Sequence, residues 1–221
     1  MESFCIGEAI KVGWEKFKAH YLFMWIIFGV TIGVSIFFNL LQHGVDKNSF
    51  AHLVITLLSV ATGITLQLWL IRAYLDLIDL DKEGEVKALF VHYRLMWRYL
   101  GAAILYGIIV VLGLIALIVP GIYFALKYQF YAYLIVDKNL DVFGALKKSA
   151  EMTQGVKWKL FGFLLVLVGV NILGAIALLV GLLVTVPMSI LAYVFVYRAL
   201  SKRLLAPEAA APSQPTLAPA A

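Results

Sequence analysis

Long uncharged runs alternate with short charged segments along this chain. Residues 21–41 and 48–71 contain no Asp, Glu, Lys or Arg. A helix needs about 20 apolar residues to cross the hydrocarbon core of a bilayer, and both runs reach that length. The residues between them, 42–47, include Gly, Asp and Lys and are typical of a turn. The pattern therefore predicts two transmembrane helices, at about 21–41 and 50–71.

Two longer low-charge runs follow, at 99–136 and 160–197, and the second contains no charged residue at all. Each run is too long for one crossing and is just long enough for two crossings that are joined tightly. Pro120 and Gly121 supply a break in the first run, and Gly181 supplies one in the second. The predicted spans in these runs are 99–119, 122–136, 160–180 and 182–200.

The basic residues predict the topology. Arg or Lys residues flank both ends of each of these two runs, and basic residues mark the cytoplasmic side of a membrane protein. Both ends of each run therefore lie on the same side, and the number of crossings is even. In this topology only Lys47 and Lys127, of 18 Lys and Arg residues, lie on the far side or within a span. The sequence predicts six crossings with both termini cytoplasmic, although four crossings with two re-entrant hairpins fit the charges equally well.

A short amphipathic segment precedes each predicted pair of spans, at 1–20, 83–97 and 141–153. Each segment has an apolar face and a basic face, which is typical of helices that lie in the membrane interface. The chain therefore resembles three copies of one unit, an interfacial helix followed by a helical hairpin. Alternatively, any helix that precedes a span is amphipathic and basic. The apolar face of the first segment is predicted to contain Ile6, Ile10, Trp14 and Phe17.

Composition supports a membrane protein. Apolar residues make up 63% of the chain and charged residues 14%, and the mean hydropathy is +0.94. A soluble domain has about 45–50% apolar and about 25% charged residues, so a soluble enzyme, a nucleic-acid-binding domain and a disordered chain are all excluded. The fold class is all-α, a polytopic bundle of six transmembrane helices with interfacial helices. Residues 206–221 are rich in Ala and Pro and are expected to form a flexible cytoplasmic tail.

The net charge of +5 is interpreted as a basic cytoplasmic face and not as a nucleic-acid site. Basic residues on interfacial helices attract the anionic headgroups of the cytoplasmic leaflet. The expected partners are therefore membrane lipids, together with a second copy of the chain or another membrane protein. The residues expected to face anionic lipid are Lys11, Lys18, Lys87, Arg94, Lys147 and Lys148.

Four polar residues inside the predicted spans are candidates for a lipid or substrate site. Lys127 is expected in the far-side half of a span, where it either snorkels to a lipid phosphate or contacts a substrate. Gln67, Gln129 and Asn171 are expected to form hydrogen bonds between helices, with a polar conduit as the alternative. The predicted spans contain no Asp or Glu, which argues against a proton relay.

Catalytic and cofactor chemistry is not expected. The sequence has no His-Glu-x-x-His, Gly-x-Ser-x-Gly, Walker or dinucleotide-binding pattern. His43, Asp46 and His52 lie close together in the sequence, but a metal site needs three or four converging ligands. The single cysteine, Cys5, excludes an intrachain disulfide.

Several short motifs carry a resemblance to a known family. They are Val119-Pro120-Gly121-Ile122-Tyr123, Leu134-Ile135-Val136-Asp137, Gly144-Ala145-Leu146-Lys147-Lys148-Ser149, Thr153-Gln154-Gly155 and Trp158-Lys159-Leu160-Phe161-Gly162. Over residues 4 to about 205, the chain resembles the bacterial membrane proteins grouped with the glycerophosphoryl diester phosphodiesterase membrane domain, which include the YciC-like proteins. The resemblance implies a six-span bundle of the bacterial inner membrane with an unknown function. The sequence shows no clustered His, Glu and Asp for phosphodiester hydrolysis, so the enzymatic activity is not expected.

The sequence thus favours a non-enzymatic membrane protein that organises lipids or partner proteins through its basic cytoplasmic face. The alternative is a transporter of small solutes or lipids, or a subunit of one, with a polar intramembrane site near Lys127.

Overall fold

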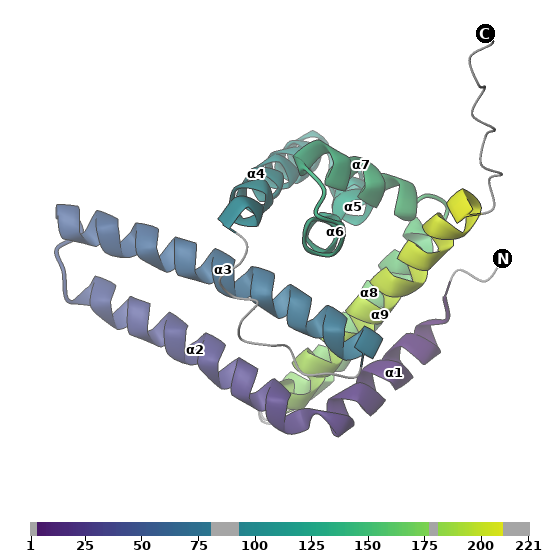
Figure 1. Ribbon diagram of the computed structural model, residues 1–221, viewed down its shortest axis with the longest axis horizontal. Helices are drawn as coiled ribbons and strands as arrows, with labels where there is room; N and C mark the ends of the chain where they lie inside the picture. Colours follow the sequence, from purple (N-terminus) through teal and green to yellow (C-terminus); the bar gives the residue numbers. More distant parts are fainter. Residues whose placement is uncertain (1–3, 81–92, 177–180, 210–221) are drawn as a thin grey trace, which may run out of the picture.

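The computed structural model describes residues 4–80, 93–176 and 181–209. Every regular element in these ranges is an α-helix, which confirms the predicted all-α class (Figure 1). The helices are α1 (Ile6–Ala19), α2 (Tyr21–His43), α3 (Phe50–Leu80), α4 (Tyr93–Ala116), α5 (Ile118–Tyr128), α6 (Tyr131–Lys138), α7 (Val142–Met152), α8 (Lys157–Ile176) and α9 (Leu182–Ala209).

Five helices in the described ranges are long and apolar enough to cross a membrane: α2, α3, α4, α8 and α9. At most 44% of the residues in the apolar part of any of them are buried inside the protein. Large apolar side chains such as Leu40, Ile115 and Ile176 remain exposed on their surfaces. Lipid can cover such surfaces at no cost, whereas water cannot, because apolar patches of this extent are not stable in water. The chain is therefore a multi-pass membrane protein.

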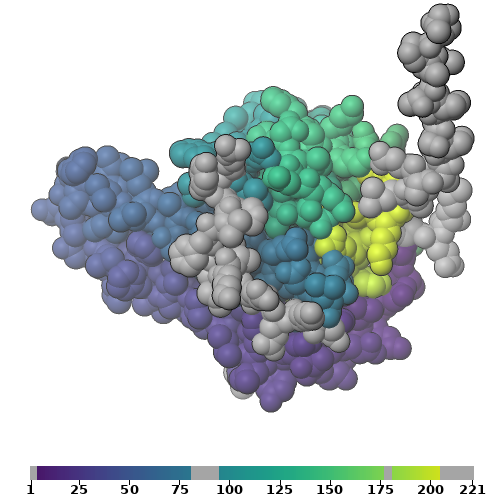
Figure 2. All heavy atoms as spheres, in the orientation of Figure 1, coloured from purple at the N-terminus to yellow at the C-terminus, as the bar shows by residue number. Residues whose placement is uncertain are grey.

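Helices α2 and α3 form a hairpin that projects from the rest of the molecule (Figures 1 and 2). Both predicted helices are present, but α3 continues past the predicted end at Ile71 to Leu80. Arg72 and Asp76, one helical turn apart, form an ion pair of 3.2 Å, so the helix continues through these charged residues. The extension matters for the fold because it buries Leu75 and Leu77 completely in the core.

The first predicted break lies a few residues earlier than expected. Helix α4 ends at Ala116, and Leu117 is extended, with φ −169° and ψ 152°. Pro120 is the third residue of α5. The N–H groups in the first turn of a helix have no partner within it, so proline, which lacks an N–H group, does not break the helix there. Gly113 and Gly121 bring α4 and α5 together, because a Cβ atom on Gly113 would lie 3.0 Å from the Cα atom of Gly121.

The boundaries around α4 also differ from the prediction. Helix α4 runs without a break from Tyr93 to Ala116, so it joins the end of the predicted interfacial helix 83–97 to the predicted span 99–119. Residues 83–92 lie outside the described residues. No boundary forms at residue 98, and Arg98 lies within the helix.

The predicted span 122–136 is wrong as a single helix. Helix α5 ends at Tyr128, and α6 begins at Tyr131. Helix α5 has 11 residues and is about 16 Å long, so it is too short to cross the hydrocarbon core alone. The break is held by residues of α7, as described below.

Helices α8 and α9 form the last hairpin. Gly174 and Gly181 meet where it turns, because a Cβ atom on Gly181 would lie 2.7 Å from the Cα atom of Gly174. Helix α9 continues to Ala209 and contains Pro187 without ending there. The predicted flexible tail 206–221 is therefore wrong for residues 206–209, which continue the helix, and residues 210–221 lie outside the described residues.

The first helix packs against the last. Figure 1 shows α1 beside α9, and Ala9, Gly13 and Phe17 of α1 are buried. The predicted apolar face is wrong in part, because Phe17 is buried but Trp14 is 41% exposed. Small residues decide the contact, since they let two helix backbones approach closely. A Cβ atom on Gly13 would lie 2.7 Å from the carbonyl oxygen of Met188.

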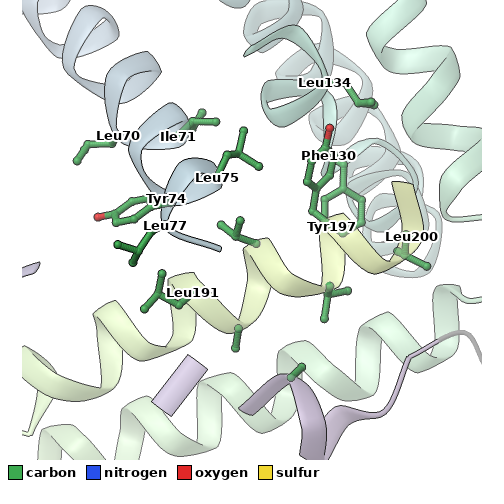
Figure 3. Close-up of a cluster of buried hydrophobic side chains, with 14 of the residues drawn as sticks. Leu70, Ile71, Tyr74, Leu75, Leu77, Phe130, Leu134, Leu191, Tyr197 and Leu200 are labelled. Atoms are coloured by element: carbon green, nitrogen blue, oxygen red, sulfur yellow. The ribbon is translucent and has the colours of Figure 1, made fainter. Parts of the chain in front are cut away.

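The core lies where α3, α6 and α9 meet (Figure 3). Phe130, Leu134 and Tyr197 have almost no exposed surface, and the rings of Phe130 and Tyr197 lie 5.8 Å apart. The short helix α6 also contacts α4 and α7. A helix too short to span a membrane is thus held at the centre of the fold. The predicted segment 141–153 contains α7, whose first turn is capped by Asp141.

Candidate functional site

An ionic cluster with a buried centre joins three helices. Arg198 of α9 pairs with Asp79 of α3 and, at 2.8 Å, with Asp137 of α6. The hydroxyl of Tyr197 donates a hydrogen bond of 2.9 Å to the other oxygen of Asp137. The side chain of Arg198 is 15% exposed and that of Asp137 only 8%. The cluster therefore fixes the ends of α3 and α6 against α9.

The carboxylate of Asp137 stays ionised in this cluster. Burial alone would raise its pKa, but hydrogen bonds from Arg198 and Tyr197 and the positive charge of Arg198 outweigh burial. The pKa of Asp137 is therefore held below its usual value of 3.8. Loss of Arg198 would be costly, because the buried carboxylate of Asp137 would keep only Lys138, 3.4 Å away, as a counter-charge.

A second contact brings the first part of α4 close to this ionic cluster. Arg98 Nη1 lies 2.9 Å from both the carbonyl oxygen and the side-chain oxygen of Asn139. Asn139 ends α6 in the left-handed conformation, with φ 53°, which asparagine adopts more readily than most residues. We call the region defined by Asp79, Arg98, Asp137, Asn139 and Arg198 the charged end of the bundle.

The break between α5 and α6 is capped by side chains of α7. The hydroxyl of Ser149 donates to the carbonyl oxygen of Lys127 at 3.1 Å and accepts a hydrogen bond of 3.2 Å from the backbone N–H of Phe130. Thr153 Oγ1 lies 3.1 Å from the same carbonyl oxygen of Lys127. Both hydroxyl-bearing residues are completely buried. They compensate for hydrogen bonds that the break removes from the helix.

A hollow of about 410 Å³ lies between α6, α7 and α9. We call it the α6–α7–α9 hollow. Lys138, Lys147 and Lys148 line it together with a single acid, Glu151. Lys148 pairs with Glu151 at 3.6 Å, and Lys147 is exposed. The other lining residues are Leu134, Leu140, Gly144, Met152, Ser201 and Leu204.

The structure places Lys127 beside α7 and the start of α8. Its carbonyl oxygen is bound by α7, and its Nζ atom lies 5.0 Å from the centre of the Tyr128 ring. Nearby, Lys157 at the start of α8 donates a hydrogen bond of 2.6 Å to the hydroxyl of Tyr123. Lys127 is close enough to Tyr123 to interact with it electrostatically. The described neighbours of its side chain therefore include the aromatic residues Tyr123 and Tyr128.

The other polar candidates have partners of their own. Tyr193 donates a hydrogen bond of 3.1 Å to Gln129 Oε1, while Gln129 Nε2 is buried with no partner among the described residues. Asn171 donates to Ser189 at 3.0 Å and so joins α8 to α9. Gln67 lines a groove between α2 and α3. Gln129 lines a different hollow, together with Tyr193.

The predicted lipid-facing lysines lie on two separate helices. Lys11 and Lys18 are exposed on α1, where Lys11 pairs with Glu15 at 4.0 Å. Lys147 and Lys148 are on α7 at the α6–α7–α9 hollow. Lys87 lies outside the described residues, and the side chain of Arg94 is not described. No cluster of three or more His, Cys, Asp or Glu side chains placed to hold a metal occurs in the described part of the chain.

Sequence reasoning missed the ionic cluster and the capping hydroxyls. Asp137 directly follows the predicted span 122–136, but Asp79 lies eight residues beyond the predicted span 50–71. The charge pattern uses Arg198 only as a flanking positive charge. The available signal was an acid directly after an apolar run, as at Asp137. Ser149 and Thr153 lay in motifs that carried the family resemblance, but their role depends on a partner more than 20 residues away.

Comparison with known proteins adds one match. Residues 101–204 match the model of a family described as a protein of unknown function, DUF975. The match begins within α4, ends within α9 and includes all the residues that line the α6–α7–α9 hollow. No curated protein matches the chain, and no solved structure matches it. The matched part agrees with a membrane protein family whose function is not established.

Proposed function

We propose that the chain is a bacterial inner-membrane protein with six crossings and both termini in the cytoplasm. In this topology residues 118–136 of α5 and α6 form a broken fourth crossing. The hydrogen bonds between Arg98 and Asn139 support it, because they bring the end of α6 back to the start of α4. We also propose that the chain is related to the glycerophosphoryl diester phosphodiesterase membrane domain and that it contains the threefold repeat.

The proposed function is the binding of anionic lipid headgroups at the cytoplasmic face, without catalysis. One observation carries it: Lys138, Lys147 and Lys148 gather from α6 and α7 around one hollow. Helix α7 is anchored by the buried Ser149 and Thr153, so its lysines are held in place against the bundle. Anchored lysines lose less conformational freedom on binding than lysines of a flexible loop.

The electrostatic gain is sufficient for a preference among lipids. A Lys or Arg near an anionic leaflet contributes roughly 1 kcal/mol, and this contribution falls as salt is added. The lysines of α7 lie on the same side of the bundle as the charged end, where α6 ends at Lys138 and Asn139. Helix α7 would then lie in the headgroup region, with its buried residues against the bundle. Transport is the weaker alternative, because Gln67 and Gln129 line different hollows.

Native mass spectrometry of the detergent-solubilised full chain tests the proposal. The wild type should retain more phosphatidylglycerol than phosphatidylcholine. The double variant Lys147→Gln/Lys148→Gln should retain about thirtyfold less phosphatidylglycerol, because two lysines that each contribute roughly 1 kcal/mol near an anionic surface are lost.

Lys47→Gln is the matched control, because Lys47 is exposed in the α2–α3 loop, far from α7 in the topology that we propose. It removes the same charge from the chain, and it should leave the lipid preference unchanged. Equal retention of both lipids by the wild type, or equal loss in the control and the double variant, would contradict the proposal.

A further inference from the structure

The α6–α7–α9 hollow combines an apolar interior with a positively charged rim. Leucine and methionine side chains, among them Leu134 and Met152, form its interior, and Lys138, Lys147 and Lys148 surround it. Its volume of about 410 Å³ lies within the range of small-molecule sites. The geometry points to a site for one lipid with an anionic phosphate headgroup, whose acyl chain enters the hollow. This inference rests on the proposed function and narrows it from a surface to a single site.

The charges around the hollow favour an anion. Glu151 is the single acid among the lining residues. Lys138 lies 3.4 Å from Asp137, but Asp137 is already compensated by Arg198 at 2.8 Å. Lys147 is exposed at the rim and is available to a ligand. Because the lysines outnumber Glu151, the rim keeps a net positive charge that a phosphate group would neutralise.

The apolar walls select among possible anions. Free phosphate would use the lysines but would leave the partly exposed side chains of Leu140 and Leu204 in the wall uncovered. A neutral lipid would cover the walls but would leave the lysines without a counter-charge. A lipid with a terminal phosphate satisfies both, since burial of its chain and pairing of its headgroup add to its affinity. Ser201, in the wall on α9, offers a further hydroxyl group.

Three soluble probes separate these possibilities on the full chain in detergent. Lysophosphatidic acid has both the phosphate and the chain, glycerol 3-phosphate has the headgroup alone, and lysophosphatidylcholine has the chain with a zwitterionic headgroup. Lysophosphatidic acid should bind saturably and at least about tenfold more tightly than either of the others. Equal affinity for glycerol 3-phosphate would show that the hollow is not used. Equal affinity for lysophosphatidylcholine would show that the lysines are not used.

Charge variants at the rim should have opposite effects. Lys147→Gln should weaken the binding of lysophosphatidic acid by about two- to fivefold, which is typical of a partly exposed charge contact. Glu151→Gln should strengthen it by a similar factor, because it removes the opposing charge and releases Lys148 from its 3.6 Å pair. Weaker or unchanged binding by Glu151→Gln would overturn the inference.

Filling the hollow tests the apolar interior. Leu204→Trp places a larger side chain in the wall and should weaken lysophosphatidic acid at least about fivefold, with no change for glycerol 3-phosphate. Leu140→Phe is the second filling variant if the first does not fold. If filling has no effect while the double lysine variant still loses phosphatidylglycerol, the single site is wrong and the proposed function stands. If neither the filling variants nor the double lysine variant has an effect, both fail.

Discussion

The hydroxyl of Ser149 on α7 donates a hydrogen bond of 3.1 Å to the carbonyl oxygen of Lys127, the residue before the last of α5. The same hydroxyl accepts from the N–H of Phe130, directly before α6. One side chain therefore bonds to both sides of a helix break. This relationship explains why an apolar run that is long enough for one helix forms two.

Ser149→Ala should destabilise the protein by about 1–3 kcal/mol, because it leaves a buried N–H group without its partner. Thermal unfolding in detergent measures the change. Ser35→Ala is the control, since Ser35 is exposed and bonds only to Thr31 of its own helix. Equal unfolding temperatures for the two variants would show that the cap is unimportant.

Arg198→Met should destabilise the protein by about 3 kcal/mol, because the buried carboxylate of Asp137 loses its closest counter-charge and keeps only Lys138, 3.4 Å away. Adding Asp79→Asn and Asp137→Asn to the same chain should recover part of the loss. Arg72→Met, which breaks the exposed pair with Asp76, should cost no more than about 1 kcal/mol. Denaturation in detergent compares the variants, and similar losses for Arg198→Met and Arg72→Met would contradict a structural role for the cluster.

The lowered pKa of Asp137 predicts a dependence of stability on pH. Its native pKa lies below the value of 3.8 expected in the unfolded chain, so its contribution is complete above pH 3.8. That contribution is lost as the pH falls through the native pKa. The unfolding temperature of the wild type should therefore decline more steeply below pH 4 than that of Asp137→Asn. Parallel curves for the two proteins in this range would refute the assignment.

Glycine substitutions test the contact between α1 and α9. Gly13→Ala should destabilise the protein, because its Cβ atom would lie 2.7 Å from the carbonyl oxygen of Met188 and the two helices must move apart. Gly29→Ala should instead stabilise α2 by up to about 1 kcal/mol, since open space surrounds Gly29 and alanine favours a helix. Unfolding temperatures that shift in the same direction would show that α1 does not depend on this contact.

Cysteine labelling tests the six crossings. In a background with Cys5→Ser, cysteines at Lys47 and Leu117 should react with a membrane-impermeant maleimide added outside the inner membrane. A cysteine at Lys147 should react only after the membrane is permeabilised. If the cysteine at position 47 is labelled and the cysteine at position 117 is not, the result would favour the four-crossing arrangement, because a re-entrant hairpin does not reach the far side.

The hydrophobic pattern predicted the long apolar helices because burial in lipid depends on local composition. The predicted segment 141–153 agrees with the bounds of α7, whose N-cap is Asp141. The pattern could not place the end of α3, since Arg72 and Asp76 compensate each other and allow a helix to continue. It also could not identify the buried face of α1, where Gly13 matters more than Trp14.

The sequence by itself determined the class of the protein, the pairing of its apolar runs and the excess of basic residues beside them. These properties depend on residues close together in the chain and on their preference for lipid or water. Only the tertiary structure decided that Arg198 meets Asp79 and that Ser149 divides α5 from α6. Such contacts join residues that are far apart in the chain, and a periodic pattern of apolar positions contains no information about which of them meet.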